Sequence, residues 1–62
     1  MEINEFINEL DDLGFNENTI KIRVGQNIYA MLKKELGDFA NKFRGVDFVL
    51  DNLLEQEEIQ LD

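Results

Sequence analysis

The sequence predicts one small α+β domain in which two helices pack on one face of a three-stranded sheet. Two segments carry apolar residues at helical spacing, and three shorter segments alternate apolar with polar residues. They follow one another in the order α-β-α-β-β, which favours a two-layer arrangement. The chain has 62 residues, and 44% of them are hydrophobic, a share typical of a folded domain. No proline, low-complexity run or internal repeat divides it, so residues 1–62 are expected to form a single domain.

The first element is an amphipathic helix that ends near Gly14. Its apolar side chains lie three or four positions apart, as one buried face requires, and they are Ile3, Phe6, Ile7, Leu10 and Leu13. Acidic residues recur on the other side, and we call Glu2, Glu5, Glu9 and Asp12 the acidic stripe. Glycine suits the position just after a helix, and Asn16 and Asn18 favour a turn beyond it.

A half-buried strand is predicted over residues 19–24, where β-branched residues recur with a period of two. The side chains expected to point inward are Ile20, Ile22 and Val24, and those expected to point outward are Thr19, Lys21 and Arg23. Gly25 interrupts this alternation. Asn27 is expected to be the N-cap of the helix that follows.

The second helix is predicted over residues 28–43, because its apolar stripe keeps one phase across Gly37. The stripe consists of Ile28, Leu32, Leu36, Phe39 and Phe43, widened by Tyr29 and Ala40. An alternative reading ends the helix at Gly37 and restarts it with Asp38 as cap, since Gly-Asp is also a stop-and-restart signal. Arg44 and Gly45 fit the C-terminal end of the longer helix.

Two strands complete the predicted fold. Residues 46–50 alternate with Val46, Phe48 and Leu50 on one face, and residues 58–62 form a short strand with Ile59 and Leu61 inward. The β-α-β unit allows a right-handed crossover with its two strands parallel, and the last two strands are expected to form an antiparallel hairpin. Leu53 and Leu54, in the connection, either cover the end of the core or form an exposed apolar contact.

Charge is strongly segregated along the chain. All six basic residues lie between Lys21 and Arg44, so residues 1–20, 21–44 and 45–62 carry net charges of −6, +4 and −6. A net charge of −8 on so small a chain repels nucleic acid and anionic membrane and attracts basic protein surfaces. For the basic residues of the centre, intramolecular pairing is favoured over contact with phosphates. A basic protein partner is therefore predicted, with no direct binding to nucleic acid or membrane.

The missing side chains argue against an enzyme. The chain has no Cys, His or Ser and a single Thr, Thr19, whereas most nucleophile–base pairs need at least one of these. Carboxylates alone can hydrolyse glycosides, but only across a cleft that a 62-residue chain hardly affords. Residues 9–14 have the glycine of a calcium loop but lack its spaced ligands. We expect no catalytic site, no cofactor and no specific metal site.

Two sets of carboxylates are the candidate partner-binding residues. One is the acidic stripe on the first helix, and the other consists of Asp47, Asp51, Glu58 and Asp62 on the predicted hairpin. The stripe is either a docking face or an ordinary solvated helix surface. Like charges facing each other destabilise a hairpin, so either Lys21 and Arg23 compensate them or an external partner does. Both sets together would resemble the phosphate rows of a nucleic acid.

Size and segment lengths predict location and association. No basic region followed by an apolar run opens the chain, so a secretory signal is not expected. No apolar stretch approaches the roughly 20 residues that span a bilayer, and a cytoplasmic location is expected. A domain this small has marginal stability. Because the chain has no disulfide, oligomerisation or docking on a partner is expected to stabilise it.

The chain resembles the small, acidic, early-type proteins encoded by phages and prophages of low-GC Gram-positive bacteria. The resemblance rests on the stretches MEINEFINELDDLGF, TIKIRVGQNIYAMLKKELG and FRGVDFVLDNLLEQEEIQLD. It implies an inhibitor of host defence, of the anti-CRISPR type that occupies the nucleic-acid-binding surface of an RNA-guided nuclease. The expected partner is then a basic nucleic-acid-binding protein, with a CRISPR effector nuclease as the sharpest candidate, in the cytoplasm of the host cell. The alternative is a structural, assembly or accessory subunit that self-associates.

Overall fold

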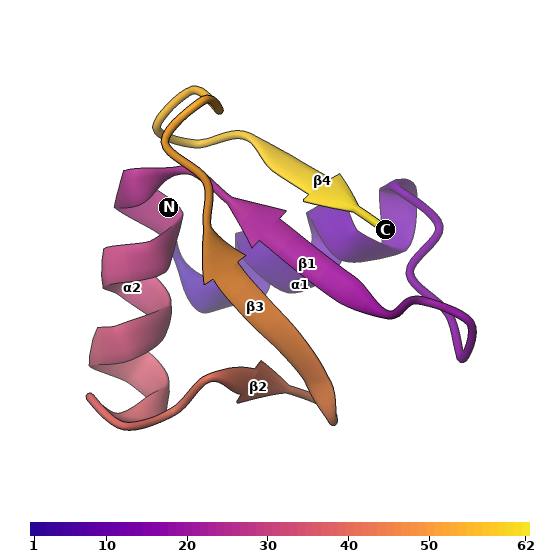
Figure 1. Cartoon of the computed structure of the whole chain (residues 1–62), viewed down its shortest axis with the longest axis horizontal. Coiled ribbons are helices and arrows are strands. Elements are labelled where there is room, and N and C mark those ends of the chain that lie inside the picture. The colour runs from indigo at the N-terminus through magenta and orange to yellow at the C-terminus, as the bar shows by residue number, and fades with distance from the viewer.

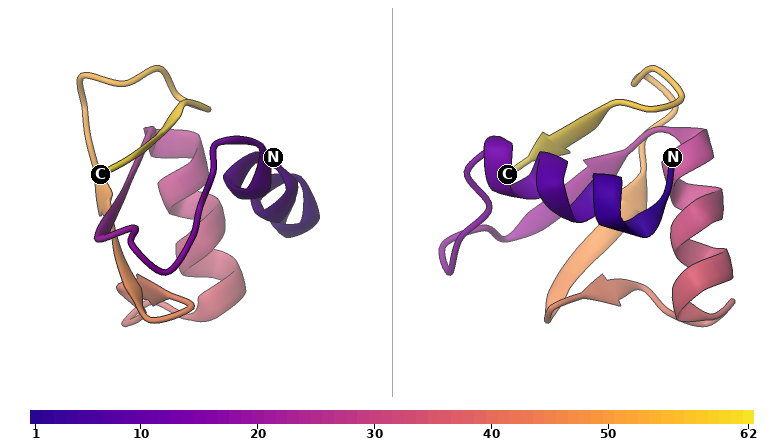
Figure 2. Two further views of the ribbon diagram at one scale, coloured as in Figure 1. Left: turned by 90° about the vertical axis from the view of Figure 1, so that its right-hand side faces the viewer. Right: turned by 180° about the vertical axis from the view of Figure 1, so that it is seen from behind.

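The computed structural model describes all 62 residues and confirms the α+β class, with four strands in place of three. The helices are α1 (Ile3–Asp12) and α2 (Gln26–Leu36). The strands are β1 (Lys21–Val24), β2 (Lys42–Phe43), β3 (Val46–Leu50) and β4 (Ile59–Leu61). Both helices cover the same face of the sheet, and the other face is open to solvent (Figures 1 and 2). Neither helix is both long and apolar enough to cross a membrane.

The sheet has the strand order β2-β3-β1-β4 and is mixed. β1 and β3 are parallel, as predicted for the β-α-β unit, with Ile22 opposite Phe48. The predicted hairpin of the last two strands is wrong, because β4 pairs antiparallel with β1 and lies on its far side from β3. The physical cause of this strand order is the connection 51–58, which crosses the end of β1. The Gly25 N–H donates to the carbonyl of Glu58 (2.9 Å) and fixes the connection there.

The core lies between the helices and the sheet and takes residues from all six elements. Its buried side chains are Phe6, Leu10, Ile22, Val24, Ile28, Leu32, Phe43, Phe48 and Ile59. The rings of Phe6 and Phe43 meet edge to face, with centroids 5.2 Å apart, a preferred geometry for aromatic pairs. Phe43 thus connects the short strand β2 to α1.

The start of α2 is capped by backbone rather than by the predicted Asn27. Gly25 is the N-cap, and no side chain bonds to the helix start. The carbonyl of Gln56 accepts the N–H groups of Asn27 (3.0 Å) and Ile28 (3.4 Å), so a loop distant in sequence satisfies donors that a helix start leaves free. A Cβ on Gly25 would lie 1.8 Å from the carbonyl oxygen of Glu55, so only glycine allows this approach.

The end of α2 corrects the prediction of one helix over residues 28–43. The helix ends at Leu36, and Gly37 follows with φ 104°, a conformation that glycine adopts without strain. The alternative reading was right about this end and wrong about a restart at Asp38, because the chain turns back and enters β2. Phe39, assigned to the apolar stripe, lies in this turn and is 99% exposed.

Arg44 and Gly45 form a hairpin turn rather than the end of a helix. They are the two residues between the paired positions Phe43 and Val46, and both have positive φ, 52° and 81°. A two-residue loop with both φ values positive matches the twist of antiparallel strands. The dipeptide that was read as a C-terminal helix signal therefore creates the fourth strand.

Besides Phe39 and Leu36, which is the last residue of α2 and 39% exposed, three apolar residues predicted to point inward are substantially exposed. Ile20 is 75% exposed, because β1 begins one residue later at Lys21. Leu13 follows the last residue of α1 and is 50% exposed, and Leu50, at the end of β3, is 37% exposed. Periodicity was correct within each element and failed at the element ends.

Candidate partner-binding surfaces

The acidic stripe lies on the outer face of α1, away from the sheet. All four of its residues are exposed, and none of their carboxylates takes part in an ion pair or a side-chain hydrogen bond. Residues three and four apart are neighbours on a helix surface, where like charges repel. These carboxylates therefore remain available to a cationic group from outside.

The helix dipole acts against part of this charge. Glu5 lies in the first turn of α1, where negative charge is favourable, but Glu9 and Asp12 lie toward the other end, where no basic residue occurs. Negative charge near a helix C-terminus is unfavourable by typically 0.3–1 kcal/mol. Folding alone thus does not account for the carboxylates in the C-terminal half of the stripe.

The open face of the sheet carries charges of alternating sign. Lys42 lies opposite Asp47 in the β2–β3 pair, and Lys21 lies opposite Asp47 in the β3–β1 pair. Asp62 follows β4 beside Lys21, whose carbonyl accepts its backbone N–H (2.9 Å). Opposite charges on neighbouring strands stabilise a sheet, so acidic residues here have partners within the fold.

Arg23, in the centre of the open face, holds two of the candidate carboxylates. Its Nη1 donates to Oδ2 of Asp51 (3.0 Å), and its Nη2 donates to Oδ1 of Asp62 (3.2 Å) and Oε1 of Gln60 (2.8 Å). Hydrogen bonds to Asp51 and then to Asp62 raise the pKa of Arg23 above its ordinary value. The guanidinium therefore connects the segment after β3 to the end of β4.

Asp51 is held ionised from two sides. The backbone N–H of Leu53 donates to its Oδ1 (2.9 Å), and this bond, followed by the bond from Arg23, lowers the pKa of Asp51 although desolvation acts in the opposite direction. The same bond from Leu53 fixes the turn that leaves β3. Asp51 is thus a structural carboxylate at the start of the connection 51–58.

The remaining two sheet-side carboxylates also have intramolecular partners. Asp47 forms an ion pair with Lys42 (3.1 Å). The Oε1 of Glu58 accepts the backbone N–H of Glu55 (3.0 Å), and its Oε2 accepts from the Gln60 amide (3.3 Å). All four sheet-side carboxylates are therefore engaged within the molecule.

α1 lies on one side of the sheet (Figure 2), so the stripe on this helix and the sheet-side carboxylates are two separate sets. The repulsion expected across a hairpin does not arise, because β3 and β4 are not neighbours. Of the two compensating residues considered, Arg23 has this role for Asp51 and Asp62, while Lys21 forms no ion pair. Binding of a partner by either set stays a prediction.

Basic residues of the central segment contact their own aromatic neighbours. The Nζ of Lys33 lies 5.3 Å from the ring centre of Tyr29 and 5.5 Å from that of Phe48, and it donates to the carbonyl of Ala40. The guanidinium of Arg44 lies 5.3 Å from the ring centre of Phe43. These contacts agree with the intramolecular role favoured for the basic segment.

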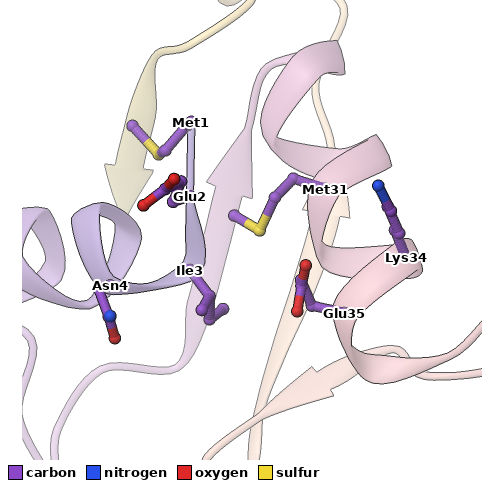
Figure 3. A pocket seen from close by; sticks show the side chains of 7 residues that line it. All are labelled: Met1, Glu2, Ile3, Asn4, Met31, Lys34 and Glu35. Carbon is purple, nitrogen blue, oxygen red and sulfur yellow. The ribbon is translucent and has the colours of Figure 1, made fainter.

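A cleft of about 430 Å³ lies between the start of α1 and the middle of α2 (Figure 3). Its lining includes Met1, Ile3 and Met31, with Glu2 and Glu35 among its charged residues. This cleft could not be predicted from the sequence, because it requires α1 and α2 to lie side by side. Met1 precedes the first predicted helix and Met31 was not part of the second apolar stripe, so no sequence pattern marked either methionine.

Two further apolar side chains stand free of the core. Phe39 is 99% exposed after α2, and Leu53 is 95% exposed in the connection 51–58. Leu54, beside it, is partly buried. Of the two roles considered for this leucine pair, Leu53 fits an exposed apolar contact.

No group of three or more carboxylates lies close enough together to hold a metal ion. Comparisons with protein-family models, with curated proteins and with solved structures found no match for this chain.

Proposed function

We propose that the protein is a non-enzymatic acidic binding protein that docks on a basic surface of a nucleic-acid-binding protein through its acidic stripe. The observation that supports this proposal most is the contrast in pairing. Carboxylates on the open sheet face have cationic or hydrogen-bonding partners, whereas those of the stripe have none. Unpaired like charges on one exposed face are complementary to a basic surface and give association that salt weakens.

The partner's chemistry follows from the sign and density of the charge. A surface that binds phosphate groups is basic, and a stripe of carboxylates on one helix competes for the same cations. Together with the resemblance to phage and prophage proteins, this supports inhibition of a host defence protein, with a CRISPR effector nuclease as the sharpest candidate. In that role the protein acts in the cytoplasm of the host cell and displaces nucleic acid from its partner.

The experiment compares two double variants with equal net charge. Glu5→Lys with Glu9→Lys reverses the middle of the stripe, while Glu17→Lys with Glu55→Lys reverses two exposed carboxylates that take no part in side-chain ion pairs. Binding to a purified CRISPR effector nuclease is measured at low and high salt, with and without competing DNA. We expect the stripe variant to lose binding and the control variant to retain most of it.

Equal binding by both variants and the wild type would reject the stripe as the docking face. Circular dichroism of each variant checks that the fold is intact. If the effector does not bind at all, a pull-down from bacterial lysate, washed first at low and then at high salt, identifies whichever basic protein is retained.

A self-associating subunit is the second candidate function, and the 95% exposure of Leu53 favours it. An exposed leucine in a loop is the type of apolar contact that carries binding energy when a partner covers it. Sedimentation velocity over a range of protein concentrations tests this candidate. A constant monomer that binds a basic partner supports the inhibitor, and a concentration-dependent shift that Leu53→Ser removes supports the subunit.

A further inference from the structure

The cleft between α1 and α2 has an apolar floor. The side chain of Met1 is only 5% exposed, while its ammonium group pairs with Glu57 (3.2 Å) and fixes the chain end. Met31 and Ile3 are partly buried and pack against the core. In Figure 3, Met31 extends from α2 toward the first turn of α1, where Ile3 lies. An apolar group that enters the cleft would therefore be removed from water on several sides.

Methionine suits a cleft that must accept side chains of different shape. Its unbranched thioether is flexible and polarizable, and methionine is enriched at adaptable binding surfaces. The chain has only two methionines, and both line this cleft. The floor is therefore expected to adjust to apolar side chains of different shape through rotation of the methionine side chains.

Charges around the cleft are complementary to a basic neighbour of such a side chain. Glu2 and Glu35 line the cleft together with Lys34, and none of the three takes part in an ion pair. Glu2 also belongs to the acidic stripe, so the cleft and the stripe are continuous. Exposed carboxylates next to an apolar pocket select a segment that carries both an apolar and a cationic group.

We propose that the cleft binds an apolar side chain that is flanked by lysine or arginine in the partner protein. This inference rests on the proposed function, because it makes the cleft the apolar anchor site of the same docking face. Burial of one side chain supplies affinity that is independent of salt, and the stripe supplies the salt-dependent attraction. Interfaces commonly combine such a central anchor with a charged rim.

The net charge of the chain favours a segment of another protein over a second copy of this chain as the occupant of the cleft. Phe39 is the most exposed apolar side chain of the molecule, and insertion of its ring into the cleft of another copy would bury it. However, each copy carries a net charge of −8, and bringing two such molecules together is opposed by their mutual repulsion. A basic partner is attracted by the same charge.

The two methionines make the cleft directly observable. With ¹³C-labelled methionine methyl groups, each signal in the NMR spectrum reports on a residue that lines the cleft. The probes are two acetylated, amidated pentapeptides, Lys-Lys-Leu-Lys-Lys and Lys-Lys-Gly-Lys-Lys, titrated at low salt. They have equal charge and differ only in the apolar side chain. We expect the leucine peptide to shift the Met31 methyl signal and to bind roughly 10- to 100-fold tighter than the glycine peptide.

The outcomes separate this inference from the proposed function. Equal affinity for both peptides, with amide shifts along α1 and unmoved methionine signals, would overturn the cleft and leave the stripe as docking face. Absence of binding by either peptide would overturn both. The methionine signals of the wild type could instead move with protein concentration in the absence of peptide, while those of Phe39→Ala stay fixed. This outcome would assign the cleft to a second copy of the chain.

Two variants at one position complete the test. Met31→Gln keeps the length of the side chain and makes it polar, and we expect it to reduce the preference for the leucine peptide about tenfold. Met31→Leu keeps the site apolar and is expected to retain the preference. If Met31→Gln proves unfolded by circular dichroism, the two-peptide comparison on the unaltered protein still decides the question.

Discussion

The outer face of α1 and the open face of the sheet carry the same type of side chain with opposite consequences. On the sheet, strands bring Lys42, Asp47 and Lys21 side by side, so negative charges lie next to positive ones. On α1, three- and four-residue spacing brings only carboxylates together. The first arrangement stabilises the fold and the second weakly opposes it. A carboxylate is therefore informative about function only once its neighbours in space are known.

The sheet side also shows how a short chain holds its C-terminal segment without a disulfide. Arg23 bonds to Asp51 at the start of the connection 51–58 and to Asp62 beyond its end. Within the connection, the carbonyl of Gln56 caps α2. These contacts make residues 51–62 part of the folded unit. No comparable contact depends on the stripe of α1, so changes on the two sides should have separable effects.

The largest expected effect comes from Gly25→Ala, which disturbs the connection 51–58 and leaves the acidic stripe unchanged. The added Cβ would lie 1.8 Å from the Glu55 carbonyl oxygen and 2.7 Å from Gln56, so the loop that caps α2 must move. We expect a loss of about 3 kcal/mol in the free energy of unfolding, measured by urea denaturation. Gly14→Ala is a useful contrast, because there only the positive φ of 88° opposes the substitution and no atom is near. Equal stability of Gly25→Ala and wild type would contradict the capping role of Gln56.

The next effect in size is expected from Arg23→Met, which keeps the aliphatic stem and removes the charge. Asp51 and Asp62 would then face each other without a cation, so we expect a lower thermal midpoint. Lys21→Met is the matched control, since it lies on the same strand and face and forms no ion pair. If both variants melt at the same temperature, the paired carboxylates of the sheet contribute no more than unpaired ones, and the contrast between the two faces fails.

The sequence predicted most of the core and failed where the fold depends on distant partners. Phe6, Leu10, Ile22 and Phe48 were assigned inward from periodicity alone, and all are buried. The capping of α2 by Gln56 could not be predicted, because a backbone carbonyl leaves no mark in the identity of its residue. The turn at Arg44 was missed because arginine is rare at positive φ. The glycine that follows it fits a hairpin turn and a helix end equally well.

The placement of the candidate residues was predicted in part for the same reason, while their role in binding stays a prediction. The acidic stripe needed only helical spacing, and the helix formed as expected. The second set was assigned to one hairpin, and this hairpin was wrong because β4 pairs with β1 rather than with β3. Strand order is a property of the whole chain, so a local pattern predicted the strands β3 and β4 but the wrong neighbours for them.

Low pH should reduce the free energy of unfolding, because the Asp51 carboxylate on the sheet side becomes protonated. Its pKa in the folded protein lies below the ordinary value of 3.8, so the unfolded chain takes up the proton first as the pH falls. The contribution of ionised Asp51 to stability is complete well above pH 3.8. It declines as the pH falls through that value toward the lower pKa of the folded protein. Thermal midpoints of wild type and Asp51→Asn, measured from pH 7 downward, should converge in this range. A constant difference between them down to the most acidic point would contradict the assignment.

The smallest expected effect, and the most diagnostic, is that of Asp12→Lys at the end of α1. The change replaces an unfavourable charge near the helix C-terminus with a favourable one and gives Glu9 an oppositely charged neighbour three residues on. We expect a gain of about 0.5–1 kcal/mol in the free energy of unfolding. The same change removes one carboxylate of the stripe and adds a cation, so binding to a basic partner should weaken.

Glu17→Lys is the control for Asp12→Lys, because it changes the net charge equally in an exposed turn outside any helix. It should leave stability within about 0.5 kcal/mol of wild type and weaken binding less. Stability and binding thus move in opposite directions at Asp12 only if the stripe is kept for a partner rather than for the fold. A variant that gains stability and binds undiminished would show that the stripe is an ordinary solvated helix surface, and the contrast between the two faces would then reflect chain geometry alone.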